Sequence, residues 1–482
     1  MIETAAVLRP VLRPAPRRVL RTEARRSAHA VVLAPAALTL FLGMWGIRRE
    51  GTLWGDEAVT YELAHRTVPE IWRTLGSVDA VHGLYYLFMH AVFAVWDGGL
   101  VALRLPSVLA MCAVAAGVAL IGRRLAGPRA GLLAGLVLAL LPIAQQYAQE
   151  GRSYALVCAL VTWGTWLLLK RWWVAYGVVM LLACLLHEFA VLALLAHGVT
   201  VWWSRFRAGG PARGWMVAAG CVVAGLTPLA LFSTTQSAQV DWIGAPGTHE
   251  LVPFAVLALL GWACACTRAA ASVRTVALPL LVLPMGLLLA VSYLRPLFLD
   301  RYVLPYVIGL ALLLGALLDR YWTRLLALSS VAAALAGLAV YGPDLRSPES
   351  RTSDVGAVAL AVRDAGRTGD GLLFTPARRR EYTLVHPHAF HGLTDLSLDR
   401  SPRASDTLFG TEADPAVIRS RMLASPRIVV VRDLAGRPLD AVAGEEAKRE
   451  VLRTYFEERA DRTVGRARVT VYVRISQVSQ AS

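Results

Sequence analysis

The sequence predicts a polytopic α-helical membrane protein with a small α/β domain at its C-terminal end. Three observations predict this fold class. The chain of 482 residues is 56% hydrophobic, with a mean hydropathy of +0.51, and soluble proteins of this length are far less apolar. Its apolar residues gather in long runs separated by short charged loops, and only internally hydrogen-bonded helices cross lipid in such runs. After about residue 345 the runs stop and short strand-like segments begin.

The N-terminal part of the chain is basic. Residues 1–28 are polar and rich in arginine, and the apolar run at about 29–47 lacks the small-residue cleavage pattern of a signal peptide. We therefore expect a cytoplasmic N-terminus followed by an uncleaved first span. The net charge of +15 does not indicate nucleic acid as a partner, because many of the arginines lie in short loops between spans, where they act as topology signals.

Apolar runs predict eleven membrane spans, with a variant of twelve or thirteen left open. The runs lie at about 29–47, 101–122, 131–147, 154–170, 173–187, 189–204, 214–232, 251–267, 275–293, 302–318 and 323–341. The loops alternate in charge, and the positive-inside rule places the arginine-rich set in the cytoplasm. The first loop, 48–100, and the C-terminal region then face outward from the plasma membrane. The run "LYYLFMHAVFAVW" at 84–96 is too short to cross and is interpreted as a re-entrant or interfacial helix.

Residues 345–482 are predicted to form an extracytoplasmic α/β domain that follows the transmembrane domain at 29–344. Strand-like runs at 371–374, 427–431 and 469–473 alternate with helical patterns at 353–366, 415–424 and 443–459. No glycine-rich phosphate loop follows a strand in this sequence, so we expect no nucleotide there.

Four outward loops carry polar and ionisable side chains at membrane depth, where such groups are costly unless they line a polar cavity. The set comprises Asp56, Glu57, Asp79 and His82 in the first loop, Glu150, Arg152 and Tyr154 in the second, His187 in the third, and Arg295, Arg301 and Tyr302 in the fourth. Isolated charges and aromatics at an interface are ordinary, so we expect Arg104 to cap a helix or reach the interface and Trp54 to anchor it. Carboxylates and arginines together on one side predict a cavity at the outer surface.

Such a cavity suits a substrate that has an anionic head and a lipid tail. Arginine side chains bind phosphate, and a carboxylate can take a proton from an attacking hydroxyl group. Transfer of a group from a lipid phosphate to a hydroxyl requires both. In an alternative interpretation the first-loop and second-loop carboxylates hold a divalent cation, Mg²⁺ or Mn²⁺; no other cofactor or metal site is expected.

Several motifs occur in an order and spacing that are more specific than any of them alone. They are "LWGDEA", Asp79-x-x-His82 followed by "LYYLFMH", "RLPS", "GRRLAGPRAGLLAGLVLALLP", "YAQEGRSYAL" and "RYVLP". Over about residues 30–320 the chain resembles the GT-C superfamily of integral-membrane glycosyltransferases, in the bacterial branch related to protein O-mannosyltransferases (glycosyltransferase family 39-like) and lipid A aminoarabinose transferase. The resemblance implies a bundle of eleven to thirteen helices. It also implies transfer of a sugar such as mannose or another hexose from a polyprenyl-phosphate donor to a lipid, glycan or protein acceptor at the outer face.

The resemblance also implies roles for individual residues. The family's catalytic aspartate falls on Asp56, with Glu57 beside it, and its phosphate-side basic position falls on Arg301. Further candidates are Arg152 and Arg295 for the donor phosphate, and Asp79, His82, Glu150, Tyr154, His187 and Tyr302 for the substrate. The sequence departs from the family pattern at 82–84, "HGL", and at 187–189, "HEF", so the identity of the acceptor does not transfer.

Two other classes of function compete with a transferase. One is a protein without catalysis, either a lipid-carrier transporter or a scaffold for envelope assembly, and the other is a phosphatase of lipid-linked sugars. The polar residues crowd one interface, whereas transporters place their sites near mid-membrane, and this favours catalysis. Sugar transfer to an added acceptor separates a transferase from a phosphatase, which uses water.

Overall fold

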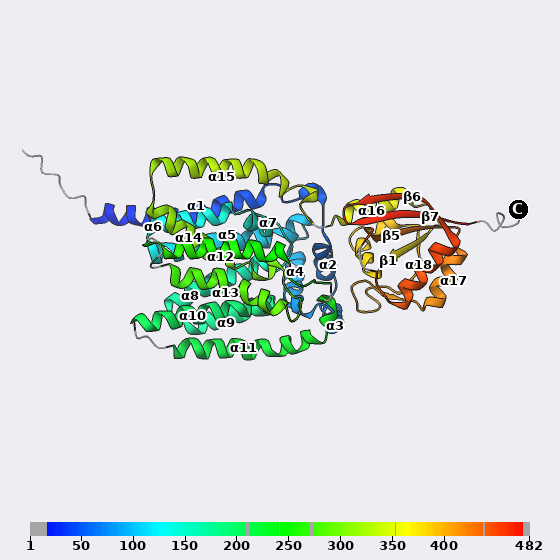
Figure 1. The fold of residues 1–482 in the computed structure, drawn as a ribbon, viewed down its shortest axis with the longest axis horizontal. Helices are drawn as coiled ribbons and strands as arrows, with labels where there is room; N and C mark the ends of the chain where they lie inside the picture. The colour runs from blue at the N-terminus through cyan, green and yellow to red at the C-terminus, as the bar shows by residue number, and fades with distance from the viewer. Residues whose placement is uncertain are drawn as a thin grey trace, which may run out of the picture.

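The computed structural model describes residues 17–208, 212–240, 242–268, 271, 273–351, 353–436 and 439–475. The chain forms a long helical bundle with a mixed α/β domain at one end (Figure 1). Helix α1 (Arg17–Met44) begins at the opposite end, and the long helices run side by side along the bundle. The predicted class, a multi-pass helical membrane protein with a small C-terminal α/β domain, is confirmed.

Each predicted span coincides with a helix or a bent pair of helices. They are α1, α5 (Leu100–Ala126), α6 (Pro128–Leu140) with α7 (Pro142–Ala148), α8 (Tyr154–Lys170), α9 (Trp173–Leu186), α10 (Val191–Ala208), α11 (Arg213–Thr234), α12 (Thr248–Cys266), α13 (Arg274–Ser292), α14 (Tyr306–Arg320) and α15 (Arg324–Asp344). Within the described residues, six helices are long and apolar enough to cross a membrane by length and composition, or seven with the α6–α7 pair, which is bent by 66°. The number of eleven crossings and the orientation of the termini stay predictions.

The interior of the bundle depends on close approach between helices. A Cβ atom added to Gly315 of α14 would lie 2.5 Å from the backbone nitrogen of Ala134, and one added to Gly309 would lie 2.2 Å from the carbonyl oxygen of Ala277. Small residues let membrane helices approach in this way. Helices α11, α12 and α15 instead expose large apolar side chains, among them Leu231, Leu259 and Leu325.

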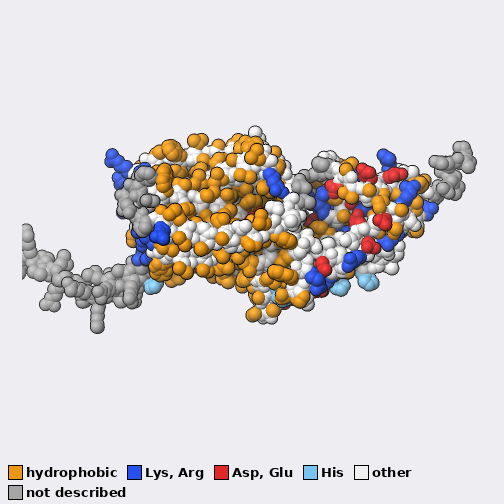
Figure 2. Space-filling model, turned by 90° about the horizontal axis from the view of Figure 1, so that it is seen from below, with side chains coloured by type: hydrophobic (Ala, Val, Ile, Leu, Met, Phe, Trp, Pro, Cys, Tyr) orange, Lys and Arg blue, Asp and Glu red, His pale blue; other side chains and the backbone are white. Residues whose placement is uncertain are grey.

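Surface charge divides the molecule along its length. Hydrophobic side chains cover the face of the bundle seen in Figure 2, whereas Lys and Arg side chains gather at the end that is farthest from the C-terminal domain. The C-terminal domain carries acidic and basic side chains together (Figure 2). This distribution suits a bundle in lipid, because an apolar band then meets the hydrocarbon and the charges lie beyond it.

The first loop, 48–100, folds into short helices at the end of the bundle that faces the C-terminal domain (Figure 1). Its elements are η1 (Arg49–Gly51), α2 (Gly55–Ala64), α3 (Val68–Ser77), η2 (Ala80–His82) and α4 (Gly83–Val95). Helix α3 begins at a capping box, in which the Thr67 N–H donates to Glu70 at 2.8 Å. Helix α4 has 13 residues, which matches the short helix predicted at 84–96.

The C-terminal domain is built on a five-stranded sheet with the order β2-β1-β5-β7-β6. The strands are β1 (Gly371–Thr375), β2 (Thr394–Asp395), β5 (Arg427–Asp433), β6 (Phe456–Val464) and β7 (Ala467–Arg474), with a separate pair β3 (Leu398–Arg400) and β4 (Thr411–Glu412). Strand β1 runs parallel to β2 and β5, and β7 runs antiparallel to β5 and β6. The helices are α16 (Val355–Ala365), α17 (Pro415–Ala424) and α18 (Ala443–Tyr455).

One prediction for this domain is wrong. The helix expected over 443–459 ends at Tyr455, and Phe456 begins strand β6. Strand β6 lies at the edge of the sheet, where residues 457–463 are exposed on both faces. An exposed edge strand needs no alternation of apolar and polar residues, so its sequence resembles a continuation of the charged helix before it.

Candidate active site

Asp56 and Glu57 occupy the first turn of α2 but lie in different environments. The Glu57 side chain is fully buried. Arg49 donates to its two oxygens at 2.9 and 2.8 Å, Arg104 donates at 2.8 and 2.7 Å, and the Gly151 N–H donates at 3.0 Å. Burial alone would raise the pKa of Glu57, but the two guanidinium groups lower it to about 2. Glu57 therefore joins the loop to the bundle as a buried carboxylate.

The expectation for Arg104 is wrong. Its side chain neither caps a helix nor reaches the interface, because it is fully buried. Besides Glu57, it donates to the carbonyl oxygens of Ile47 at 2.6 Å and Thr52 at 2.7 Å. A buried guanidinium persists only when its donors are paired, so Arg104 fixes the backbone that leads into α2.

Asp56, in contrast to Glu57, is half-buried and lies close to an arginine of the bundle. Its Oδ2 atom lies 3.8 Å from Nη2 of Arg301, in η6 (Asp300–Val303), and 34% of the Asp56 side chain is exposed. The Arg301 guanidinium lies 5.8, 5.9 and 5.7 Å from the ring centres of Trp54, Tyr154 and Tyr302. Trp54, expected to anchor the interface, is instead buried beside this arginine. Aromatic rings hold a guanidinium in place while leaving its hydrogen-bond donors free.

A cluster of aromatic rings and histidines adjoins Arg301. His187, between α9 and η3 (Glu188–Ala190), lies with its ring centre 4.6 Å from Tyr302, 5.6 Å from Tyr154 and 5.5 Å from His82. Four segments distant in sequence meet here, as the sequence predicts for the outer loops. Burial, together with neighbouring guanidinium groups, holds the pKa of His82 well below its ordinary value, so this histidine is neutral at physiological pH.

Arg152 and Asp79 are joined to the site through Tyr86. Arg152 Nη1 donates to the Tyr86 hydroxyl at 3.2 Å, to Thr60 Oγ1 at 3.3 Å and to the carbonyl oxygen of Asp56 at 3.4 Å. The Tyr86 hydroxyl in turn donates to the Asp79 carboxylate. The buried Arg152 thus supports the turn that carries Asp56.

Glu150 and Arg295 differ in how they relate to the residues around Asp56. Glu150 Oε1 lies 2.9 Å from Nε of Arg351, a residue beyond the last span. Burial raises the pKa of Glu150 to about 6, although Arg351 counteracts this. Arg295 is exposed near the end of α13, and its charge acts on Glu188. Glu150 therefore lies near Arg301, whose charge also acts on it, whereas the interaction of Arg295 is with Glu188.

Buried polar atoms around Asp56 lack partners. Within the described part of the chain, six side-chain atoms at the site have no hydrogen-bond partner: Trp54 Nε1, His82 Nδ1, Glu150 Oε2, Arg152 Nε, His187 Nδ1 and Arg301 Nε. Native interiors leave few such groups unsatisfied. Their convergence is typical of a site that takes a polar ligand. No group of three or more His, Cys, Asp or Glu side chains suited to a metal ion occurs among the described residues.

The C-terminal domain contacts the start of α2 directly. The Gly55 N–H donates to Ser353 Oγ at 3.1 Å, and the Val355 N–H donates to the Leu53 carbonyl oxygen at 2.8 Å. Farther along the loop, Arg66 donates to the Thr407 carbonyl oxygen at 3.1 Å. The sequence motifs gave no signal of this contact, because the paired residues are ordinary loop residues far apart in the chain.

No family model and no curated protein matches the chain. Among solved structures it is similar to ArnT from Cupriavidus metallidurans bound to undecaprenyl phosphate, with 12% identity, coverage of 91% of this chain and 97% of that chain, and a TM-score of 0.55. The apo state of the same protein gives 14% identity, coverage of 92% and 98%, and the same TM-score of 0.55. The chain therefore shares the fold of these structures, and the resemblance to the GT-C superfamily that the motifs indicate is confirmed at the level of the fold.

Proposed function

We propose that this protein is a membrane glycosyltransferase that moves a sugar from a polyprenyl-phosphate donor to a hydroxyl acceptor at the outer face of the membrane. The observation that carries the proposal is the pairing of a partly exposed carboxylate, Asp56, with the guanidinium of Arg301 at 3.8 Å, among buried polar atoms without partners. The GT-C fold supports it, since the similar ArnT structure holds undecaprenyl phosphate.

In the proposed mechanism Asp56 is the general base. The acceptor oxygen forms a bond to the anomeric carbon while the bond between that carbon and the phosphate oxygen breaks. The proton of the hydroxyl passes to Asp56, and the electron pair of the broken bond leaves with the phosphate. Arg301 and the nearby Arg152 stabilise the negative charge on the leaving phosphate. A positioned base contributes roughly 10²–10⁴-fold to such a rate.

Glu57 has a supporting role in this proposal. Its two oxygens already accept hydrogen bonds from Arg49, Arg104 and the Gly151 N–H, so it holds Asp56 in place instead of taking a proton. The alternative, in which carboxylates hold Mg²⁺ or Mn²⁺, can be distinguished from base catalysis by the effect of a chelator. A chelator would abolish metal-dependent transfer and would leave transfer by a base alone unchanged.

The test is sugar transfer by the purified full-length protein from a panel of undecaprenyl-phosphate sugars. We expect Asp56→Asn to lower turnover by at least about 10²-fold, because the amide cannot accept the proton, while binding of undecaprenyl phosphate and folding stay nearly unchanged. Asp97→Asn is the matched control, since it removes an exposed carboxylate from the same loop. An Asp56→Asn protein that folds, binds the lipid and transfers sugar at the wild-type rate would refute the mechanism. A wild-type protein that binds the lipid but transfers from no donor would favour a transporter or scaffold.

A further inference from the structure

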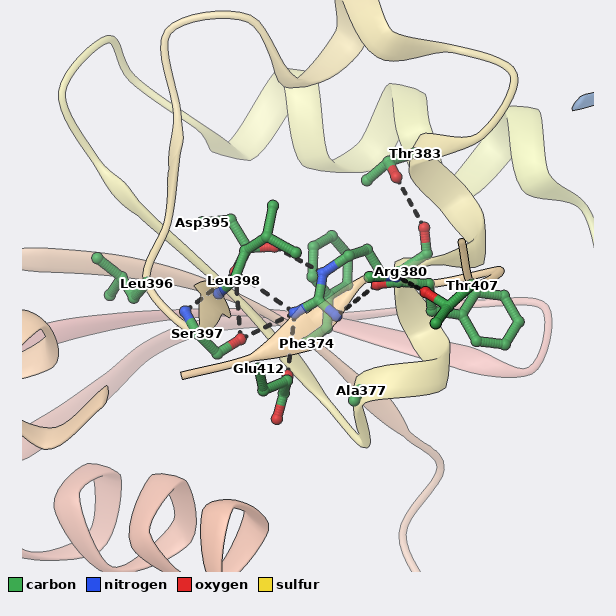
Figure 3. A network of polar contacts seen from close by, with 12 residues as sticks. Phe374, Ala377, Arg380, Thr383, Asp395, Leu396, Ser397, Leu398, Thr407 and Glu412 are labelled. Carbon is green, nitrogen blue, oxygen red and sulfur yellow. Dashed lines mark hydrogen bonds and ion pairs between the residues drawn. The ribbon is translucent and has the colours of Figure 1, made fainter. Parts of the chain in front are cut away.

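The segment η8 (Ala377–Thr383) of the C-terminal domain is held by a network of buried ions. Arg380, which is 2% exposed, donates to Asp395 at 2.7 Å, Ser397 at 2.9 Å and Glu412 at 3.0 Å (Figure 3). Glu412 also accepts from the buried Lys448 at 2.7 Å. Paired charges of this kind fix geometry, since breaking them would leave an uncompensated buried charge. The backbone of η8 is therefore rigidly placed.

The two residues on either side of Arg380 differ in role: one anchors η8 to the C-terminal domain and the other faces α2. Arg379 Nε donates to Asp433 at 2.6 Å, which anchors η8 to the end of β5. Glu381 points to α2 instead: its Oε2 atom is 2.8 Å from the position that a Cβ on Gly55 would take. Its Oε1 atom lies 3.5 Å from Nη1 of Arg379, and 21% of the Glu381 side chain is exposed. The C-terminal domain thus presents a carboxyl group beside the residue that precedes Asp56.

Asp56 consequently lies between two groups from different parts of the molecule. Arg301, from the bundle, approaches it at 3.8 Å, and η8, from the C-terminal domain, contacts α2, which Figure 1 shows between the bundle and that domain. If the donor phosphate binds Arg301, an acceptor that attacks from the face opposite to the phosphate must approach from the side of the C-terminal domain. Glu381 stands on that side.

We infer that Glu381 is an acceptor-binding residue, whose carboxylate accepts a hydrogen bond from a hydroxyl group of a polyhydroxyl, sugar-like acceptor held between α2 and the C-terminal domain. The inference rests on the proposed function, because it needs Asp56 as the base and Arg301 as the phosphate partner. Carboxylates bind sugar hydroxyls through charge-assisted hydrogen bonds, which are stronger than neutral ones.

The electrostatics of Glu381 give this role a pH signature. Burial raises the pKa of Glu381 to about 7; Arg379 lowers it and Asp56 raises it. The charged and titratable groups that face it are Arg378, Arg379, Asp56, Asp433 and Tyr382. The carboxylate that accepts the hydrogen bond is thus lost as the pH falls below about 7.

The experiment measures transfer by full-length wild-type, Glu381→Gln and Asp364→Asn proteins at pH values on both sides of 7. The acceptor probes are methyl α-mannoside, which is a polyhydroxyl compound, and a serine-containing peptide. Asp364→Asn is the matched control because it removes an exposed carboxylate from the same domain. Binding of undecaprenyl phosphate is measured in parallel to show that each variant is folded.

For wild type we expect transfer to methyl α-mannoside, with a KM for this acceptor that rises as the pH falls through about 7. In Glu381→Gln this KM should be about 10- to 100-fold higher, the range given by loss of one hydrogen bond to a charged group, and independent of pH over that interval. Asp364→Asn should match wild type.

Several results would overturn the inference. One is a Glu381→Gln protein with the wild-type acceptor KM and pH profile, and another is a Glu381→Gln protein that no longer binds undecaprenyl phosphate, which would make Glu381 a residue of folding. The third is an active wild type that uses only the peptide. A wild type that transfers sugar to neither probe but does transfer it to a lipid acceptor would overturn the inference alone. A wild type that transfers to no lipid, glycan or peptide acceptor from any donor would refute the proposed function as well.

Discussion

The buried carboxylate of Glu57 allows the energy that holds the first loop, 48–100, against the bundle to be worked out. Glu57→Gln keeps the volume of the side chain but removes its charge, which leaves the guanidinium groups of Arg49 and Arg104 buried without a counterion. A pKa lowered from 4.5 to about 2 corresponds to about 3 kcal/mol. Removal of one partner of a buried ion pair costs a similar amount, about 3–5 kcal/mol. We therefore expect the variant to lose about 3 kcal/mol of stability.

The assay is unfolding of the purified protein in detergent, followed through the loss of helical circular dichroism. Glu50→Gln is the control, because Glu50 is an exposed carboxylate in the same loop, and such surface changes usually stay within about 0.5 kcal/mol. Since the folded pKa of Glu57 lies below its unfolded value, its contribution is present above about 4.5 and is lost as the pH falls to about 2. The difference between wild type and Glu57→Gln should shrink over that window. Equal stability of the two proteins at neutral pH would contradict the argument.

Two further predictions concern the donor site and the topology. Arg301→Ala should weaken undecaprenyl phosphate binding by about 10- to 100-fold, and Arg301→Lys by less, since lysine keeps the charge but loses the bidentate geometry. Binding is measured by titration, with Arg320→Ala, at the opposite end of α14, as the control. Equal affinity of wild type and Arg301→Ala would rule the contact out. A cysteine at Asp440 should react with a membrane-impermeant reagent on intact cells and one at Arg129 should not, because arginine-rich loops stay in the cytoplasm; the reverse pattern would invert the topology.

The helices of the membrane part were predictable from the sequence because few backbone structures can satisfy their hydrogen bonds in lipid. Each run of apolar residues long enough to span became a helix, from α1 to α15, since a backbone in hydrocarbon must satisfy its own hydrogen bonds. The same constraint made polar residues conspicuous, so His82, Tyr154, His187, Arg301 and Tyr302 could be selected and do meet in space. The structure leaves their chemical roles as predictions.

The remaining features depend on pairings that local sequence does not express. From the sequence, Arg104 was expected at a helix end, and only the structure shows that it pairs with Glu57. Trp54 was expected to anchor the interface, and only the structure places it beside Arg301. Glu381 lies in a charged run, "ARRRE", of a separate domain. Only the tertiary fold decides that the three arginines pair with carboxylates of their own domain while Glu381 faces α2.

The contact between α2 and the C-terminal domain also bears on how the protein is made. Gly55 and Ser353 are 298 positions apart in the chain, and domains fold in order from the N-terminus during synthesis. The first loop, 48–100, is therefore made long before the C-terminal domain that contacts it leaves the ribosome. A nascent chain that ends between residues 301 and 380 contains Asp56 and Arg301 but not Glu381, so it lacks part of the proposed acceptor site. A chain that stops after α15 would keep every helix of the bundle and lack this half of the site.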